Sequence, residues 1–103
     1  MKVRFSPAAQ ADLLDIAIFI AQDNPRRALT FVDELELKCE ALGEAPGIGT
    51  SGPELGEGIR VLPHARYLIF YREANRGLRI ERILHGSRDI GVEDLVEDGP
   101  AAD

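Results

Sequence analysis

The stretch that decides the fold is RYLIFYREANRGLRIERILH, residues 66–85. Two apolar, strand-like runs, 66–73 and 78–85, flank the turn sequence Asn75-Arg76-Gly77, and this pattern predicts a β-hairpin. A tight turn there pairs Glu73 with Leu78. Because side chains alternate along a strand, this register sets which residues share each face of the hairpin.

The register predicts one apolar face and one face with a basic rim. The first face, which should pack on helices, holds Tyr67, Ile69, Tyr71, Leu78, Ile80, Arg82 and Leu84. The opposite face holds Arg66, Leu68, Phe70, Arg72, Arg79, Glu81, Ile83 and His85. Its apolar centre is surrounded by cations, so we expect a groove there with an apolar floor (Leu68, Phe70 and Ile83) and an arginine rim.

The first half of the chain predicts a strand followed by two helices. Residues 2–5 alternate as in a strand, and Ser6-Pro7 supplies an N-cap and a first-turn proline for a helix that runs to about residue 23. Asn24-Pro25 repeats the signal for a second helix, which ends near Gly43. Two helices joined so tightly must form an antiparallel hairpin.

Helical periodicity predicts which side of each helix is buried. The expected buried face of the first helix is Leu13, Leu14, Ala17, Ile20 and Ala21, with Asp12 and Phe19 on the polar side. The expected buried stripe of the second is Ala28, Phe31, Val32, Leu35, Cys39 and Leu42, with Leu37 outward. Phe19 and Leu37 are therefore either scattered surface apolar residues or contacts for a partner or a second copy.

The remaining segments complete an α+β fold. Six glycines and two prolines between Gly43 and Gly58 indicate a long surface connection, and 59–62 reads as one further strand. The expected order is β-α-α-β-β-β, with an antiparallel helical hairpin packed on one face of a small, mostly antiparallel sheet. We expect one domain over residues 1–92, followed by a flexible acidic tail, 93–103.

The charges are distributed unevenly along this acidic chain. The net charge is −6, yet residues 58–92 carry seven arginines against three carboxylates. Arginine without lysine suits bidentate contacts to carboxylate or phosphate. A single cysteine, the absence of a membrane-length apolar run and the lack of a signal-like N-terminus predict a cytoplasmic protein with no membrane contact.

The segment His85-Gly86-Ser87-Arg88-Asp89 invites a catalytic interpretation, but it fits a turn better. A hydrolase triad gathers side chains from separate segments, and G-x-S-x-G is missing here. Neither histidine has a partner at a metal-ligand spacing, so we expect no metal site and no cofactor. Arginine, tyrosine and histidine on a small sheet could serve metal-free RNA cleavage, or could bind a protein partner.

Four segments in this order resemble the RelE/ParE superfamily of bacterial toxins: SPAAQADLLDIAIFIA (6–21), ALTFVDELELKCEALGEAPGIG (28–49), GIRVLPHARYLIFYR (58–72) and RILHGSRDI (82–90). The resemblance is greatest to the ParE-like branch. It implies the toxin of a type II, plasmid-stabilisation-like module that a cognate antitoxin, ParD-like or another DNA-binding protein, holds silent. Operator DNA would be reached only through the antitoxin.

The resemblance leaves two mechanisms open. ParE-like members inhibit DNA gyrase by binding, whereas RelE-like members cleave messenger RNA on the ribosome with basic residues and a C-terminal tyrosine or histidine. Here no lysine follows Lys38, and the C-terminus EDLVEDGPAAD is polyanionic, which repels RNA and favours gyrase inhibition. A degenerate family member that only binds its partner is a third possibility.

The resemblance and the charge pattern together name candidate site residues. For binding of the antitoxin or target these are Phe19, Leu37, Arg60, Arg66, Tyr71, Arg72, Arg79, Arg82 and Arg88. The gyrase-binding mechanism implies no catalytic residue. Under the ribonuclease alternative, His85 or Tyr71 would act as acid or base, and Arg66, Arg72 and Arg88 would contact the scissile phosphate.

Overall fold

A computed structural model describes residues 1–87 and 90–95 of the 103-residue chain. Its elements, in chain order, are β1 (Lys2–Phe5), α1 (Pro7–Ala21), α2 (Pro25–Ala41), β2 (Thr50–Ser51), η1 (Pro53–Leu55), β3 (Arg60–His64), β4 (Tyr67–Ala74), β5 (Gly77–His85) and η2 (Val92–Leu95). This confirms the predicted α+β order and adds the short strand β2 and the 3₁₀ helix η1 within the expected connection, and a second 3₁₀ helix, η2, where the predicted tail begins. None of the described helices is long and apolar enough to span a bilayer.

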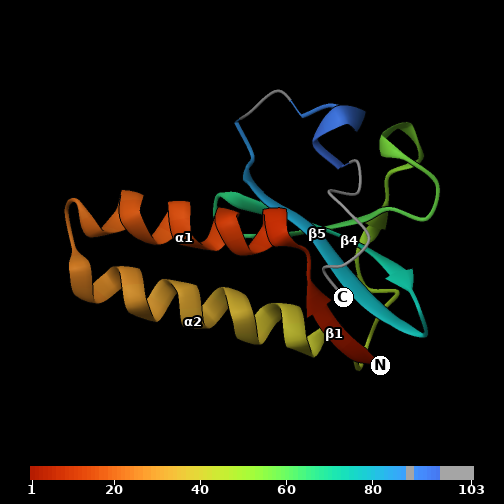
Figure 1. Ribbon diagram of the computed structural model, residues 1–103, viewed down its shortest axis with the longest axis horizontal. Helices are drawn as coiled ribbons and strands as arrows, with labels where there is room; N and C mark the ends of the chain where they lie inside the picture. The colour runs from red at the N-terminus through yellow and green to blue at the C-terminus, as the bar shows by residue number, and fades with distance from the viewer. Residues whose placement is uncertain (88–89, 96–103) are drawn as a thin grey trace.

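The strands form one mixed sheet in the order β1-β5-β4-β3-β2. β1 runs parallel to β5, and the other neighbours are antiparallel, as expected for a mostly antiparallel sheet. The helical hairpin lies to one side of the sheet, and η1 and η2 lie to the other (Figure 1). The predicted pairing of Glu73 with Leu78 is confirmed.

Both helices begin at the predicted caps. The Ser6 hydroxyl accepts a hydrogen bond from the Ala9 amide at 2.9 Å and donates one to the Glu81 carbonyl at 2.7 Å, so it also ties α1 to β5. The Asn24 side chain accepts from the Arg27 amide at 3.0 Å. Each cap satisfies a backbone donor that the first helical turn leaves unpaired.

The main core lies between the helices and the sheet. The predicted stripe of α2 is confirmed, and it packs on Ala9, Leu13 and Ile16 of α1 and on Ile69, Tyr71, Leu78, Ile80 and Ile83 of the sheet. Two predictions for α1 were wrong. Leu14 is 61% exposed, whereas Asp12 is only 7% exposed. Because α1 is apolar on nearly every side, periodicity alone could not select its buried face.

A β-bulge changes the faces of β5. Phe70 pairs with Arg82 but the next residue, Tyr71, pairs with Ile80, so Glu81 is an extra residue in β5. Beyond it the alternation is shifted by one. Ile83 therefore packs in the helix-side core and Leu84 on the opposite face, the reverse of the prediction.

The opposite face of the sheet is covered by the chain itself. Phe70 and Leu84 form a second, smaller core with Ile59 and Leu95, and the partly buried residues around it are Leu55, Val61, Leu68 and Ile90. The predicted open groove with an apolar floor is therefore wrong, because η1 and η2 occupy that position. The expected boundary at residue 92 falls at the start of η2, whose Leu95 is buried, and residues 96–103 of the predicted tail lie outside the described residues.

Candidate partner-binding surfaces

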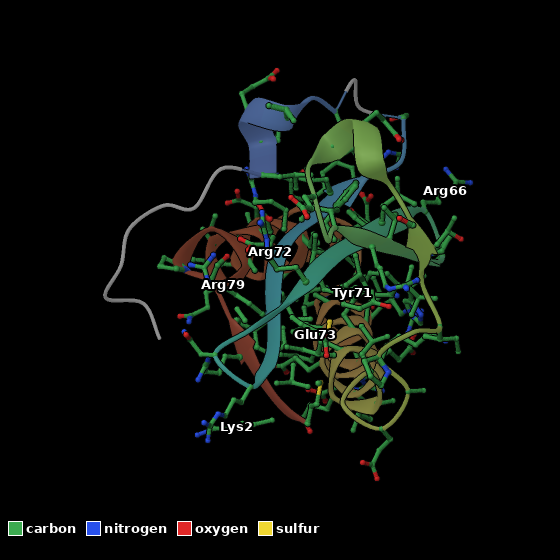
Figure 2. All side chains as sticks on the ribbon, turned by 90° about the vertical axis from the view of Figure 1, so that its right-hand side faces the viewer. Lys2, Arg66, Tyr71, Arg72, Glu73 and Arg79 are labelled. Atoms are coloured by element: carbon green, nitrogen blue, oxygen red, sulfur yellow. The ribbon has the colours of Figure 1, made fainter. Side chains whose placement is uncertain are left out.

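Two of the predicted rim arginines belong to an ion-pair network on the sheet. Arg79 and Glu81 are each 2% exposed, and the Arg79 Nη1 atom lies 2.5 Å from Glu81 Oε1. Arg72, which is the cross-strand neighbour of Arg79, places its Nε 2.9 Å from the other oxygen of Glu81. Figure 2 shows Arg72 and Arg79 next to each other on the two strands. A single carboxylate thus holds two guanidinium groups.

Arg82 connects the sheet to α1. Its guanidinium binds both carboxylate oxygens of Asp12, each at 2.8 Å, and Asp12 Oδ2 also accepts the Ile83 amide at 2.9 Å. Strand β1 stops pairing at Ile80, so the Asp12 carboxylate takes the place of the missing strand at the edge of β5. Arg82 further donates to the Asp94 carbonyl at 3.1 Å, which secures η2.

Tyr71 and Arg60 hold the connection between α2 and β2. The Tyr71 hydroxyl donates to the Pro46 carbonyl and accepts from the Gly49 amide, both at 2.9 Å, and the residue is 1% exposed. Arg60 donates to the Gly49 carbonyl at 2.8 Å. The polar groups of both side chains therefore bind the backbone of this connection.

A pocket of about 520 Å³ lies beside this connection. The charged residues that line it are Arg60 and Arg72, and also Glu57 and Glu73. Two cations are thus balanced by two anions, which makes this pocket a poor site for phosphate.

Arg66 differs from the other candidates because it is exposed, in the turn between β3 and β4 (Figure 2). Its carbonyl accepts the Gly86 amide at 2.8 Å, so it lies near His85. Tyr71 and Arg72 are about five residues further along β4, roughly 16 Å away at about 3.3 Å per residue. The structure therefore does not gather the ribonuclease candidates, and Arg88 lies outside the described residues.

The segment after β5 forms a turn around His85. The Nδ1 atom of His85 accepts the Ser87 amide at 3.1 Å and lies 2.7 Å from the Ser87 hydroxyl. The His85 and Tyr67 rings pack edge to face, with centroids 5.3 Å apart. Within the described residues there is no group of three histidine, cysteine or acidic side chains that could hold a metal.

The helical hairpin exposes large apolar side chains. Phe19 is 66% and Leu37 67% exposed, which confirms their predicted outward positions. Sequence reasoning missed Leu14 and Ile18 of α1, which are also exposed. The composition of α1 could have indicated this exposure, because only three of its 15 residues are polar and one side of a helix is enough to face the core. By contrast, Cys39 is fully buried in the main core, and burial raises the pKa of its thiol to about 12.

A cleft of about 220 Å³ lies between α1 and the ends of β4 and β5. Asp12, Asp15 and Phe19 line it from the helix, and Tyr67 and His85 from the sheet. Burial raises the pKa of the Tyr67 phenol, which therefore stays protonated at neutral pH. Of the predicted site residues, the cleft brings together Phe19 and His85.

The arrangement of a helical hairpin on a small mixed sheet is that of a known class of bacterial toxins. A solved structure described as the chromosomal ParDE TA system from P. aeruginosa has this fold, with a TM-score of 0.71 and 23% sequence identity, over 82% of this chain and 95% of that one. Toxin ParE1 of Caulobacter vibrioides is 34% identical over 87 residues, which cover 82% of this chain and 88% of that protein.

Residues 3–90 match the family described as the ParE toxin of type II toxin-antitoxin system, parDE. The chain therefore belongs to the ParE toxin family, and the resemblance to the ParE-like branch of the RelE/ParE superfamily is confirmed. Membership in a ParDE system implies an antitoxin as its partner.

Proposed function

We propose that this protein inhibits DNA gyrase, and so replication, by binding rather than by catalysis, and that a cognate antitoxin silences it by direct contact. We propose that the toxin contacts both gyrase and the antitoxin in the cytoplasm. Membership in the ParE family supports this function. The observation that carries the mechanism is that the ribonuclease candidates lie in two separate places, with Arg66 near His85 at one end of β4 and Tyr71 with Arg72 further along it. Tyr71 is buried with both hydrogen-bonding capacities of its hydroxyl used, and Arg72 is paired with Glu81.

Among the predicted binding residues that the structure describes, Arg66 is the arginine best placed for a polar contact with the target. It is exposed in a turn, whereas Arg72, Arg79 and Arg82 are bound to carboxylates of the same chain. Arginine in such a position can bind a carboxylate or phosphate in bidentate fashion. Arg88 lies outside the described residues and stays a predicted contact.

The proposal is tested by incubating the purified toxin with gyrase and relaxed plasmid. Supercoiling should be blocked, or cleaved DNA trapped, and prior addition of the antitoxin should abolish the effect. Primer extension on a translated message serves as the opposite assay. New RNA ends without any effect on gyrase would reject the proposal in favour of the ribonuclease, and a chain that is harmless when expressed without antitoxin would be a degenerate member.

A matched pair of variants tests the role of Arg66. Arg66→Ala should raise the toxin concentration needed for half-inhibition of supercoiling by up to about fivefold, the value of one exposed ionic contact. Arg26→Ala removes an exposed arginine from the first turn of α2 and is the control. Equal inhibition by both variants would show that Arg66 does not contact the target.

A further inference from the structure

Helix α1 carries more apolar surface than the fold covers. Its inner side is buried, but Leu14, Ile18 and Phe19 on its outer side are more than half exposed. A helix that is apolar all round is normally buried on every side. The outer side of α1 is therefore suited to be covered by another molecule.

The cleft beside Phe19 continues this outer side toward the sheet. Its volume of about 220 Å³ lies below the range of roughly 300–1,000 Å³ typical of small-molecule pockets. Such a cleft suits one inserted side chain, as at protein interfaces where a few anchor residues fill pockets. Ile16 and Ile83 contribute apolar walls, and Phe19 stands at the exposed rim.

The polar groups of the cleft select a cation. Asp12 is already bound to Arg82, but Asp15 is exposed and has no hydrogen bond or ion pair within the part of the chain that the structure describes. Asp15, Phe19 and Tyr67 line the same cleft. A carboxylate close to aromatic rings is a favourable site for a guanidinium, which can form an ion pair with the carboxylate and a cation–π contact with a ring.

We propose that the antitoxin inserts an arginine side chain into this cleft, between Asp15 and the rings of Phe19 and Tyr67, while its flanking apolar residues cover Leu14 and Ile18. This inference rests on the proposed function in one respect, namely that an antitoxin binds the toxin directly. It names the residue type that must anchor the complex and the toxin residues that receive it.

Two other occupants fit less well. A second copy docked through the same side of α1 would bring two Asp15 carboxylates together, and α1 contains no basic residue to fill the cleft of its partner. Nucleic acid would be repelled by Asp15 and by the net charge of −6.

The primary test measures the affinity of the co-encoded antitoxin for the full toxin and two variants. Asp15→Asn removes the receiving charge from an exposed position without a large change in shape. Asp23→Asn, in the connection between the helices, makes the same change in net charge elsewhere and is the control. We expect Asp15→Asn to weaken binding by at least about tenfold and Asp23→Asn to leave it within about twofold. Equal affinities for both variants would overturn the proposal.

A double-mutant cycle identifies the anchoring arginine. Each arginine of the antitoxin is changed to alanine and measured against wild-type and Asp15→Asn toxin. At one position the two losses should be strongly non-additive, because each change removes the same contact. Additive losses at every arginine would show that no such contact exists.

A small probe tests the chemistry of the cleft without the antitoxin. N-acetyl-arginine amide should shift the NMR signals of the Phe19 and Tyr67 rings, whereas the neutral isostere N-acetyl-citrulline amide should not. Equal shifts with both probes would contradict a cation site. Asp15→Asn toxin should inhibit gyrase as the wild type does, so a failure of gyrase inhibition and a failure of this inference give different results.

Discussion

The arginine-rich hairpin β4–β5 and the helix α1 reverse the usual relation between polarity and exposure. In the hairpin, Arg72 and Arg79 turn toward Glu81, and Arg82 turns toward Asp12 of α1. On the outer side of α1, Leu14, Ile18 and Phe19 face solvent. The difference teaches that a cluster of cations in a sequence need not be a binding surface when the same fold supplies carboxylates to pair with it.

The two regions owe this reversal to different causes. Arg79 of β5 is almost fully buried and Arg82 is partly buried between β5 and α1, where desolvation is costly, so each requires a carboxylate at close range. Helix α1 is so apolar that one side of it is sufficient for the core, and the remaining side is left outward. We infer that the hairpin's ion pairs stabilise the toxin, whereas the outer side of α1 serves a partner.

The largest effect is expected where the two regions meet. Asp12→Ala removes the carboxylate that accepts hydrogen bonds from the Arg82 guanidinium and the Ile83 amide. The free energy of unfolding should fall by about 3 kcal/mol or more, the cost of breaking a buried pair. Urea denaturation followed by circular dichroism measures this loss. Asp15→Ala, one turn away on the exposed side, should change it by less than about 0.5 kcal/mol, and a similar loss for both would refute the structural role of Asp12.

Adjacent leucines on α1 sharpen the contrast between its two sides. Leu13 is buried in the main core, so Leu13→Ala should destabilise the toxin by about 2–4 kcal/mol. Leu14→Ala removes an exposed side chain and should change the stability by less than about 0.5 kcal/mol. Thermal unfolding of the isolated toxin compares them directly. The affinity for the antitoxin should show the reverse order. Leu14→Ala, which stays folded, should bind the antitoxin more weakly, whereas the folded fraction of Leu13→Ala should bind it as the wild type does.

Removal of one hydroxyl group tests whether Tyr71 is structural. Tyr71→Phe leaves the buried Gly49 amide unpaired, at a cost of about 1–3 kcal/mol in unfolding free energy. Tyr67→Phe is the control, because the Tyr67 hydroxyl makes no hydrogen bond within the described part of the chain. Inhibition by the folded fraction should be unchanged in both. Loss of inhibition at full stability in Tyr71→Phe would instead assign this tyrosine to the functional site.

The smallest effect is expected for an ion pair exposed on the helical hairpin. Arg27 binds Glu34 at 2.6 Å, and this hydrogen bond is the main reason that the pKa of Glu34 is lowered. The Arg27–Glu34 pair stabilises the folded protein fully at a pH above the pKa that Glu34 has in the unfolded chain. This stabilisation is lost as the pH falls through the lower pKa that Glu34 has in the folded protein. In Arg27→Gln the NMR titration midpoint of Glu34 should rise toward its usual value of 4.5. An unchanged midpoint would show that the pair does not persist in solution.

Local signals in the sequence were sufficient for much of the fold. Ser6 and Asn24 are recognisable caps, and Asn75-Arg76-Gly77 set the correct pairing of Glu73 with Leu78. The bulge at Glu81 had no local signal, because it depends on pairing across β4, and it exchanged the faces of Ile83 and Leu84.

The candidate site was harder to predict because its contacts are remote in sequence. Asp12 meets Arg82 across 70 positions, so neither helical periodicity nor the charge pattern could pair them. The outer side of α1 was recognisable in part, since Phe19 fell among polar residues, but the exposure of Leu14 required knowledge of which side the sheet covers.

The central claim is that the outer side of α1, and not the second face of the sheet, receives the antitoxin. Cross-saturation NMR tests it most directly, with protonated antitoxin bound to deuterated, methyl-labelled toxin. The methyl signals of Leu14 and Ile18 should lose intensity, whereas those of Leu84 and Leu95, enclosed in the second core, should keep it. Intensity lost at Leu84 and Leu95 but retained at Leu14 and Ile18 would contradict the account.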